Sequence, residues 1–184
     1  MKELSLNILD VAENSVKAGA SLTQIIIVEE GNKLTLQIKD DGCGMSEEVV
    51  KSVIDPFYTT RTTRKVGLGV PLLKLAAEQT GGSFSVESKT QEDNPESHGT
   101  CVTAVFFKDH LDFTPLGDVV SSIVTLIQGH PDTDFYFSHK QGEHSAELDT
   151  RQLREILGDV PLNSYEVIKW TEEYLREQYQ GFNL

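Results

Sequence analysis

Cysteine and long apolar runs are both scarce in this sequence. Of its 184 residues only Cys43 and Cys101 are cysteines, too few for a disulfide scaffold and without the paired spacing of a zinc site. No run of about 18 apolar residues could cross a bilayer. Residues 1–12 also lack the basic flank and apolar run of a secretory signal. We therefore expect two reduced thiols in a cytoplasmic protein that has no membrane partner.

Basic residues are in short supply as well. Sixteen Lys and Arg stand against 29 Asp and Glu, which gives a net charge of −13. This negative field repels nucleic acid phosphates and anionic lipids, so we expect no nucleic acid partner. The imbalance is uneven: residues 1–110 hold 11 basic and 16 acidic side chains, whereas residues 111–184 hold 5 and 13. The second part is therefore more acidic than the first.

Several common catalytic motifs are absent. The dipeptide Gly-Lys does not occur, which excludes a Walker A loop, and no G-x-G-x-x-G follows the first expected strand, as a dinucleotide fold requires. Neither H-E-x-x-H nor G-x-S-x-G is present. These absences exclude the zinc metalloprotease and serine hydrolase classes.

The hydrophobic patterning of residues 1–110 predicts a single α/β unit. We expect helices over residues 4–17 and 70–79, and another that starts at Ser46 and has Val49, Val50 and Val53 on its apolar side. We expect strands over residues 23–29, 33–39, 83–88 and 100–107. This order favours a two-layer α/β sandwich, in which a mixed, mostly antiparallel sheet carries helices on one face.

Residues 111–184 are expected to form a small acidic α+β appendage that packs on the first part. The pattern predicts a helix over residues 115–128, a hairpin of residues 134–138 with 144–149, and helices near 151–157 and 164–178. Asn163 and Glu166 fit a capping box for the last helix. Its aromatic residues suit either core packing, which we favour, or a partner contact: Phe135, Tyr136, Phe137, Trp170 and Tyr174.

Polar and glycine-rich segments punctuate the first part. Asp10 and Asn14 lie four residues apart, so both project from the same helix face, where they could hold a hydrated Mg²⁺ or simply face solvent. Asp40 begins the segment D-D-G-C-G directly after a strand. Its two glycines let a ligand approach the backbone, and the carboxylate can accept a bond from an exocyclic amine; an ordinary loop is the alternative.

A basic segment precedes the third expected helix. Arg61, Arg64 and Lys65 fall within five positions beside the glycine turn of Gly67 and Gly69. Backbone amides of a glycine turn at a helix N-terminus bind phosphate oxygens, and neighbouring cations add fixed positive charge. In a chain of net charge −13 this segment is the one obvious anion site.

Taken in order, these segments resemble the Bergerat-type ATP-binding domain shared by gyrase-type topoisomerases, ninety-kilodalton heat-shock chaperones, histidine kinases and MutL-type mismatch-repair ATPases. Residues 13–20 resemble the N box, 40–45 the first glycine box, 55–61 the F box of histidine kinases and 66–70 the second glycine box. Residues 81–88 with Gly99 and Thr100 match the closing strands. The resemblance covers residues 1–108, and we recognise no characterised domain in residues 111–184.

The resemblance implies a role for each matching position. Asn14 would ligate Mg²⁺, Lys17 would approach the phosphates, and Asp40 would accept a hydrogen bond from adenine N6. Four further residues would shape the adenine end: Gly42, Gly44, Met45 and Thr100. The lid over the triphosphate would be supplied by Tyr58, Thr59, Thr60, Arg61, Arg64, Lys65, Gly67, Leu68, Gly69 and Val70.

Three departures from the family pattern affect the expected chemistry. Asp10 stands where hydrolysing members carry a Glu that acts as general base, and its side chain is one methylene shorter. Lys65 stands where histidine kinases commonly have glycine. Only 13 residues precede Asn14, which leaves no room for a phosphoacceptor hairpin, and all five histidines follow the second glycine box. We therefore expect no autophosphorylation on an internal histidine.

Three functions remain open at this point. The first is an ATP- and Mg²⁺-dependent kinase or ATPase that acts on a protein partner in trans. The second is a nucleotide-gated interaction module, similar to anti-sigma factor kinases, with little or no catalysis. The third, a degenerate domain that binds no nucleotide, is disfavoured by five intact boxes. The sequence does not identify the partner or the oligomeric state.

Overall fold

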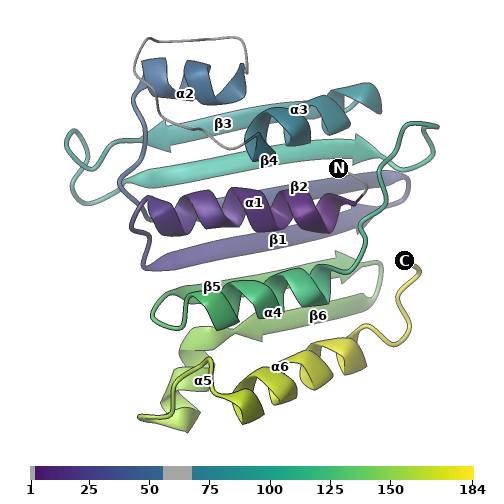
Figure 1. Cartoon of the computed structure of the whole chain (residues 1–184). Coiled ribbons are helices and arrows are strands. Elements are labelled where there is room, and N and C mark those ends of the chain that lie inside the picture. The colour runs from purple at the N-terminus through teal and green to yellow at the C-terminus, as the bar shows by residue number, and fades with distance from the viewer. Residues whose placement is uncertain (1–2, 56–67) are drawn as a thin grey trace.

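The computed structural model describes residues 3–55 and 68–184 and forms two layers (Figure 1). Its helices are α1 Leu4–Lys17, α2 Glu47–Ile54, α3 Gly69–Gln79, α4 Val119–Gly129, α5 Thr150–Leu157 and α6 Tyr165–Gln178. Its strands are β1 Leu22–Glu30, β2 Lys33–Asp40, β3 Ser83–Lys89, β4 Gly99–Phe107, β5 Asp134–Gln141 and β6 His144–Asp149. In these two stretches of chain, no helix has both the length and the apolar character needed to cross a membrane.

The six strands make one sheet in the order β3-β4-β2-β1-β5-β6. Strand β1 runs parallel to β5, and the other four neighbouring pairs are antiparallel. Helices α1, α3, α4 and α6 lie over one face of this sheet (Figure 1). The expected mixed, mostly antiparallel sheet with helices on one face is confirmed.

The burial pattern explains why these segments fold as they do. Helix α1 buries Leu4, Ile8 and Val11, spaced three or four residues apart on the face that meets the sheet. Strand β1 buries every second residue, including Ile25 and Ile27, so one face of the strand meets the helices and the other does not. Polar residues on the second face are therefore tolerated.

Residues 111–184 continue the sheet and core of the preceding residues. Strand β5 lies beside β1, with Leu22 opposite Asp134 and Glu29 opposite Gln141. Phe135 and Phe137 are buried in the common hydrophobic core. The core interpretation of these two aromatics is confirmed, whereas Trp170 and Tyr174 lie on the surface.

Two local predictions for residues 111–184 are wrong. Helix α4 begins at Val119 rather than at residue 115, because the carbonyls of Pro115 and Leu116 accept bonds from the free N–H groups of Leu4 and Ser5 at the start of α1. Asp118 then caps α4 by accepting from Ser121 N at 3.0 Å.

The predicted capping box of Asn163 and Glu166 is also absent. The residue at the N-cap position of α6 is Ser164, and its side chain makes no capping bond. The helix is held instead by burial of Val167, Thr171 and Leu175.

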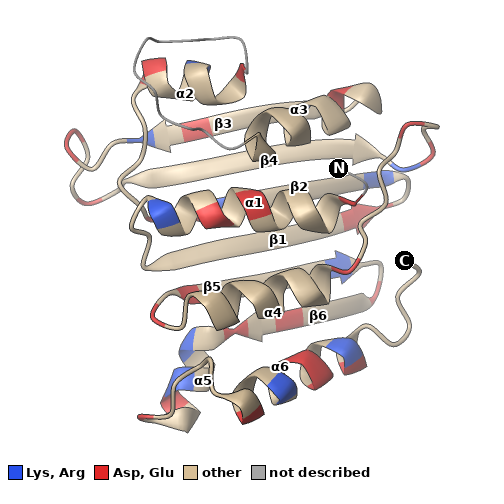
Figure 2. Cartoon of the chain, in the orientation of Figure 1, with Lys and Arg blue, Asp and Glu red and all other residues tan. Residues whose placement is uncertain are grey.

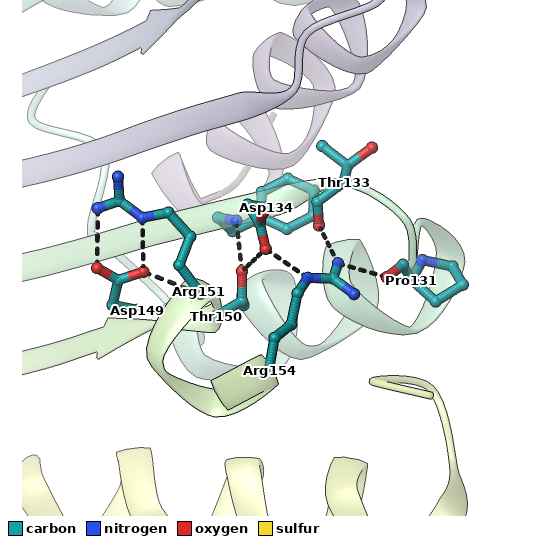
Figure 3. A network of polar contacts seen from close by, with 8 residues as sticks. Pro131, Thr133, Asp134, Asp149, Thr150, Arg151 and Arg154 are labelled. Carbon is teal, nitrogen blue, oxygen red and sulfur yellow. Dashed lines mark hydrogen bonds and ion pairs between the residues drawn. The ribbon is translucent and has the colours of Figure 1, made fainter. Parts of the chain in front are cut away.

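Figure 3 shows the polar network that fixes the start of β5. Arg154 of α5 donates to Asp134 Oδ1 at 2.7 Å and to the carbonyl of Pro131 at 2.6 Å. Thr150 donates to Asp134 at 2.8 Å and accepts from Phe135 N at 2.8 Å. The network therefore ties α5 to the loop that leads into β5.

A buried polar cluster fixes the other end of β1. Glu29 Oε1 lies 2.8 Å from His139 Nε2, and Glu29 Oε2 accepts from Lys108. The opposite ring nitrogen of His139 lies 2.8 Å from the hydroxyl of Tyr179. Burial alone would raise the pKa of Glu29, but hydrogen bonds from His139, Lys108 and Gln141 outweigh burial and lower the pKa from 4.5 to about 2.

This cluster predicts a pH-dependent stability. The pKa of Glu29 is lower in the folded chain, so its stabilisation is complete above pH 4.5 and is lost as the pH falls to about 2. Glu29→Gln should lower the free energy of unfolding by about 3 kcal/mol at neutral pH. Denaturant titrations should show this difference shrinking below pH 4.5. The neighbouring exposed Glu30→Gln is the control, and an equal loss in both variants would contradict the assignment.

The shared core predicts that the C-terminal part supports the whole fold. Phe137→Ala should lower the free energy of unfolding by about 3–5 kcal/mol, because it leaves a cavity beside β1. The exposed Tyr165→Ala should change it by less than about 0.5 kcal/mol. A single cooperative transition is expected for both variants. Separate melting of residues 111–184 would contradict a common core.

Candidate functional site

A cavity of about 440 Å³ opens between α1, the start of α3 and strands β2 and β4. Its apolar wall includes Ile38, Val53 and Val102. The residues predicted from sequence that line it are Asn14, Lys17, Asp40, Gly44, Met45, Val70 and Thr100. Residues that are up to 86 positions apart in the chain therefore meet in one hollow.

Asp40 is held rigidly at one side of this cavity. The residue is 9 % exposed. Its Oδ2 accepts from Ser15 Oγ at 2.7 Å, and its Oδ1 accepts from the backbone N–H groups of Gly42 at 2.9 Å and Thr100 at 3.3 Å. A carboxylate oxygen can accept about two hydrogen bonds, so Oδ2 retains the capacity to accept from a ligand.

Two glycines allow the loops around Asp40 to close. Gly44 has φ +69°, and a Cβ there would lie 1.9 Å from the carbonyl oxygen of Lys89. Gly99 has φ +127°, and a Cβ there would lie 2.0 Å from the carbonyl oxygen of Asp40. Any larger residue would push the loops apart and combine strain with a clash.

Further polar contacts join the loop after β2 to the loop between β3 and β4. Met45 N donates to Ser88 Oγ at 2.8 Å, and Ser88 Oγ lies 2.8 Å from Thr100 Oγ1. His98 Nδ1 lies 2.5 Å from the carbonyl oxygen of Gly42, which is itself buried against Ala18. The sequence did not single out Ser15, Ser88 or His98. Ser15 lies within the N box and Ser88 ends the matched segment 81–88, whereas His98 lies outside every matched segment.

Helix α1 supplies the polar side of the cavity. Asn14 is half-buried and Lys17 is exposed, and both line the cavity from successive positions along one helix face. Asp10 lies one turn earlier, is exposed and is not among the lining residues. A Cβ on Gly69 would come 2.7 Å from the Cβ of Asp10, so the start of α3 packs directly against this residue.

The second glycine box is described only in part. Val70 is buried and lines the cavity, Gly69 is the first residue of α3, and Leu68 is 62 % exposed at its N-cap position. The remaining predicted lid residues fall outside the described residues: Tyr58, Thr59, Thr60, Arg61, Arg64, Lys65 and Gly67. The basic phosphate site therefore stays a prediction.

Comparison with curated proteins finds bacterial kinases. The chain is 32% identical over 89 residues to sporulation kinase E of Bacillus subtilis (strain 168), which covers 48% of this chain and 12% of that protein. It is 29% identical over 85 residues to sensor histidine kinase CitA of Klebsiella pneumoniae, covering 45% and 16%. The chain thus spans less than a fifth of the length of these relatives.

Comparison with solved structures extends the similarity of fold to the C-terminal elements. The MutL ATPase domain of Aquifex aeolicus complexed with ADP matches 96% of this chain and 70% of its own, with a TM-score of 0.56 and 15% identity. The N-terminal domain of a DNA repair protein matches 81% and 53%, with a TM-score of 0.60 and 15% identity. These similarities concern the fold alone.

A protein-family model described as histidine kinase-, DNA gyrase B- and HSP90-like ATPase matches residues 2–110. The match spans more than half of the chain and includes every predicted site residue, with the cavity around Asp40 at its centre. The chain therefore belongs to the histidine kinase-, DNA gyrase B- and HSP90-like ATPase family.

Proposed function

We propose that this chain binds ATP with Mg²⁺ in the cavity beside Asp40 and transfers or releases the γ-phosphoryl group, acting on a protein partner in trans within the cytoplasm. The observation that carries the proposal is the meeting of seven predicted site residues in one cavity around a fixed carboxylate. The names of the curated relatives, a sporulation kinase and a sensor histidine kinase, support phosphoryl transfer.

Asp40 is the proposed adenine-recognition group. Its Oδ1 is occupied by two backbone N–H groups, while Oδ2 has only the Ser15 hydroxyl as donor. The exocyclic amine of adenine can therefore donate to Oδ2 without displacing a protein contact. Met45 and the apolar wall would cover the ring, and Thr100 and Gly44 would bound its edge.

Asn14 and Lys17 are the proposed contacts to the metal and the phosphates. Among residues 3–55 and 68–184 no group of three or more His, Cys, Asp or Glu could hold a metal by itself. Asn14 fits Mg²⁺ nonetheless, because Mg²⁺ takes few protein ligands and is completed by waters and phosphate oxygens. Bound Mg²⁺ would neutralise phosphate charge. Lys17 adds a positive charge at the same mouth of the cavity.

The proposed lid combines residues 58–67 with the start of α3. Arg61, Arg64 and Lys65 would neutralise the triphosphate, and the backbone amides of Gly67 and Gly69 would bind its oxygens. Val70 supports this arrangement, because it lines the cavity one residue after Gly69.

Asp10 is the proposed general base. It projects one turn before Asn14 and touches the start of α3, so it would lie beside the phosphate end rather than the adenine end. Its carboxylate could polarise an attacking hydroxyl or water.

A nucleotide-gated interaction module is the second candidate. The favouring observation is the contact between the C-terminal part and α1: His130 Nε2 lies 2.8 Å from Glu13 Oε1, directly before Asn14. Ser122 of α4 also donates to the carbonyl of Ser5 at 2.9 Å. A shift of α1 on nucleotide binding would therefore change the position of residues 111–184 without any catalysis.

Asp40→Asn should weaken ATP binding by about tenfold or more in calorimetry. The neighbouring groups would orient the Asn amide, and the charged oxygen that accepts from the adenine amine would be lost. Asp41→Asn is the matched control: Asp41 Oδ1 accepts from Ser21 N and Leu22 N outside the cavity. We expect this control to keep the affinity for ATP. Equal losses in both variants, or none in Asp40→Asn, would count against the adenine assignment.

Asp10→Asn should reduce phosphate release from γ-labelled ATP by about a hundredfold while changing the affinity for ATP by less than about threefold. Glu30→Gln, which changes an exposed carboxylate outside the cavity lining, is the control and should retain most of the turnover. Turnover that is unaffected in Asp10→Asn would remove Asp10 from the mechanism. ATP binding without any turnover in the parent chain would favour the interaction module.

A further inference from the structure

One side of α6 carries an exposed aromatic and acidic surface, here called the α6 stripe. It consists of Glu166, Trp170, Glu173, Tyr174 and Glu177, whose spacing of three and four residues puts them on one side of the helix. Trp170 is 46% and Tyr174 is 38% exposed. Their rings stack with centroids 4.8 Å apart and an interplanar angle of 13°.

The stripe is separate from the packed sides of α6. Val167, Thr171 and Leu175 face the core, while Arg176 reaches Asp118 at the N-terminus of α4. The stripe lies on the flank away from α4, at the outer end of the helix layer next to β6 (Figure 1). It is thus at the opposite end of the sheet from the cavity beside Asp40.

Three glutamates give the stripe a negative charge that no ion pair within residues 3–55 and 68–184 neutralises. Glu166, Glu173 and Glu177 make no ion pair or hydrogen bond with side chains of the described residues. Helix α6 carries both signs of charge (Figure 2). Lys169 borders the stripe, three residues after Glu166 and four before Glu173, but forms no ion pair with either. Arg176 is already bonded to Asp118 and Glu172.

We propose that the α6 stripe is a docking surface for an arginine-bearing basic segment of a partner protein. A guanidinium group stacks on an indole face and donates in pairs to carboxylates, and the stripe offers both within one helical turn. A second copy of this chain, with its net charge of −13, would bring like charge to the contact. Nucleic acid and anionic membranes are disfavoured for the same reason.

The sequence supplies a direct reporter, because Trp170 is the only tryptophan in the chain. Titration of the full chain with a blocked hexa-arginine peptide should change Trp170 fluorescence saturably in the absence of nucleotide. Hexa-lysine of the same charge should bind at least about threefold more weakly, because an ammonium group does not stack as a guanidinium does. Neither measurement depends on ATP binding, so this proposal and the proposed function can fail separately.

A charge-matched pair of variants separates the stripe from the overall negative field. Glu173→Gln with Glu177→Gln should weaken hexa-arginine binding by about fivefold or more. Glu92→Gln with Glu143→Gln removes the same charge from exposed loops and should change binding by less than about twofold. Equal weakening by both pairs, equal affinity for hexa-lysine, or no saturable change in fluorescence would overturn the proposal. A fluorescence change with protein concentration alone would assign the stripe to self-association and overturn it too.

Discussion

The hydrogen bonds to the Asp40 carboxylate hold the site together. Ser15 of α1, the loop amide of Gly42 and the β4 amide of Thr100 all donate to it, so one buried side chain joins the helix layer to two parts of the sheet. Burying a carboxylate is costly unless it is paired or hydrogen-bonded. These donors meet that cost and leave a fixed acceptor at the wall of a cavity. Gly44 and Gly99 matter because larger residues would separate the loops that bring the donors together.

The same sheet makes the C-terminal part inseparable from the rest. Pairing of β5 with β1 gives β1 a neighbour on each side, and Phe135 and Phe137 complete the core. The contact between Glu29 and His139 joins β1 to β5 at one end of this strand pair, and the Arg154 network fixes the start of β5 at the other end. Contacts of α4 with α1 then give residues 111–184 access to the helix that carries Asn14.

Much of this fold can be predicted from sequence, because strong periodicity survives tertiary packing. Helix α1 has the expected bounds. Strands β2, β3 and β4 differ from expectation by one residue at one end, and β1 by one residue at each end. The parallel pairing of β5 with β1 could not be predicted from the sequence, since the register between distant strands leaves no local signal. The start of α4 was predicted too early, because the carbonyls of Pro115 and Leu116 accept hydrogen bonds from the N-terminal end of α1. Asp40 and Asn14 followed from their motifs, whereas Ser88 and His98 act only through the fold.

A crystal structure with a non-hydrolysable ATP analogue and Mg²⁺ tests the central proposal most directly. We expect the adenine amine within hydrogen-bond distance of Asp40 Oδ2, with Ser15, Gly42 and Thr100 still bonded to the same carboxylate. The Asn14 amide oxygen should ligate the metal. A nucleotide bound elsewhere, or bound here with its adenine away from Asp40, would contradict the assignment of the cavity.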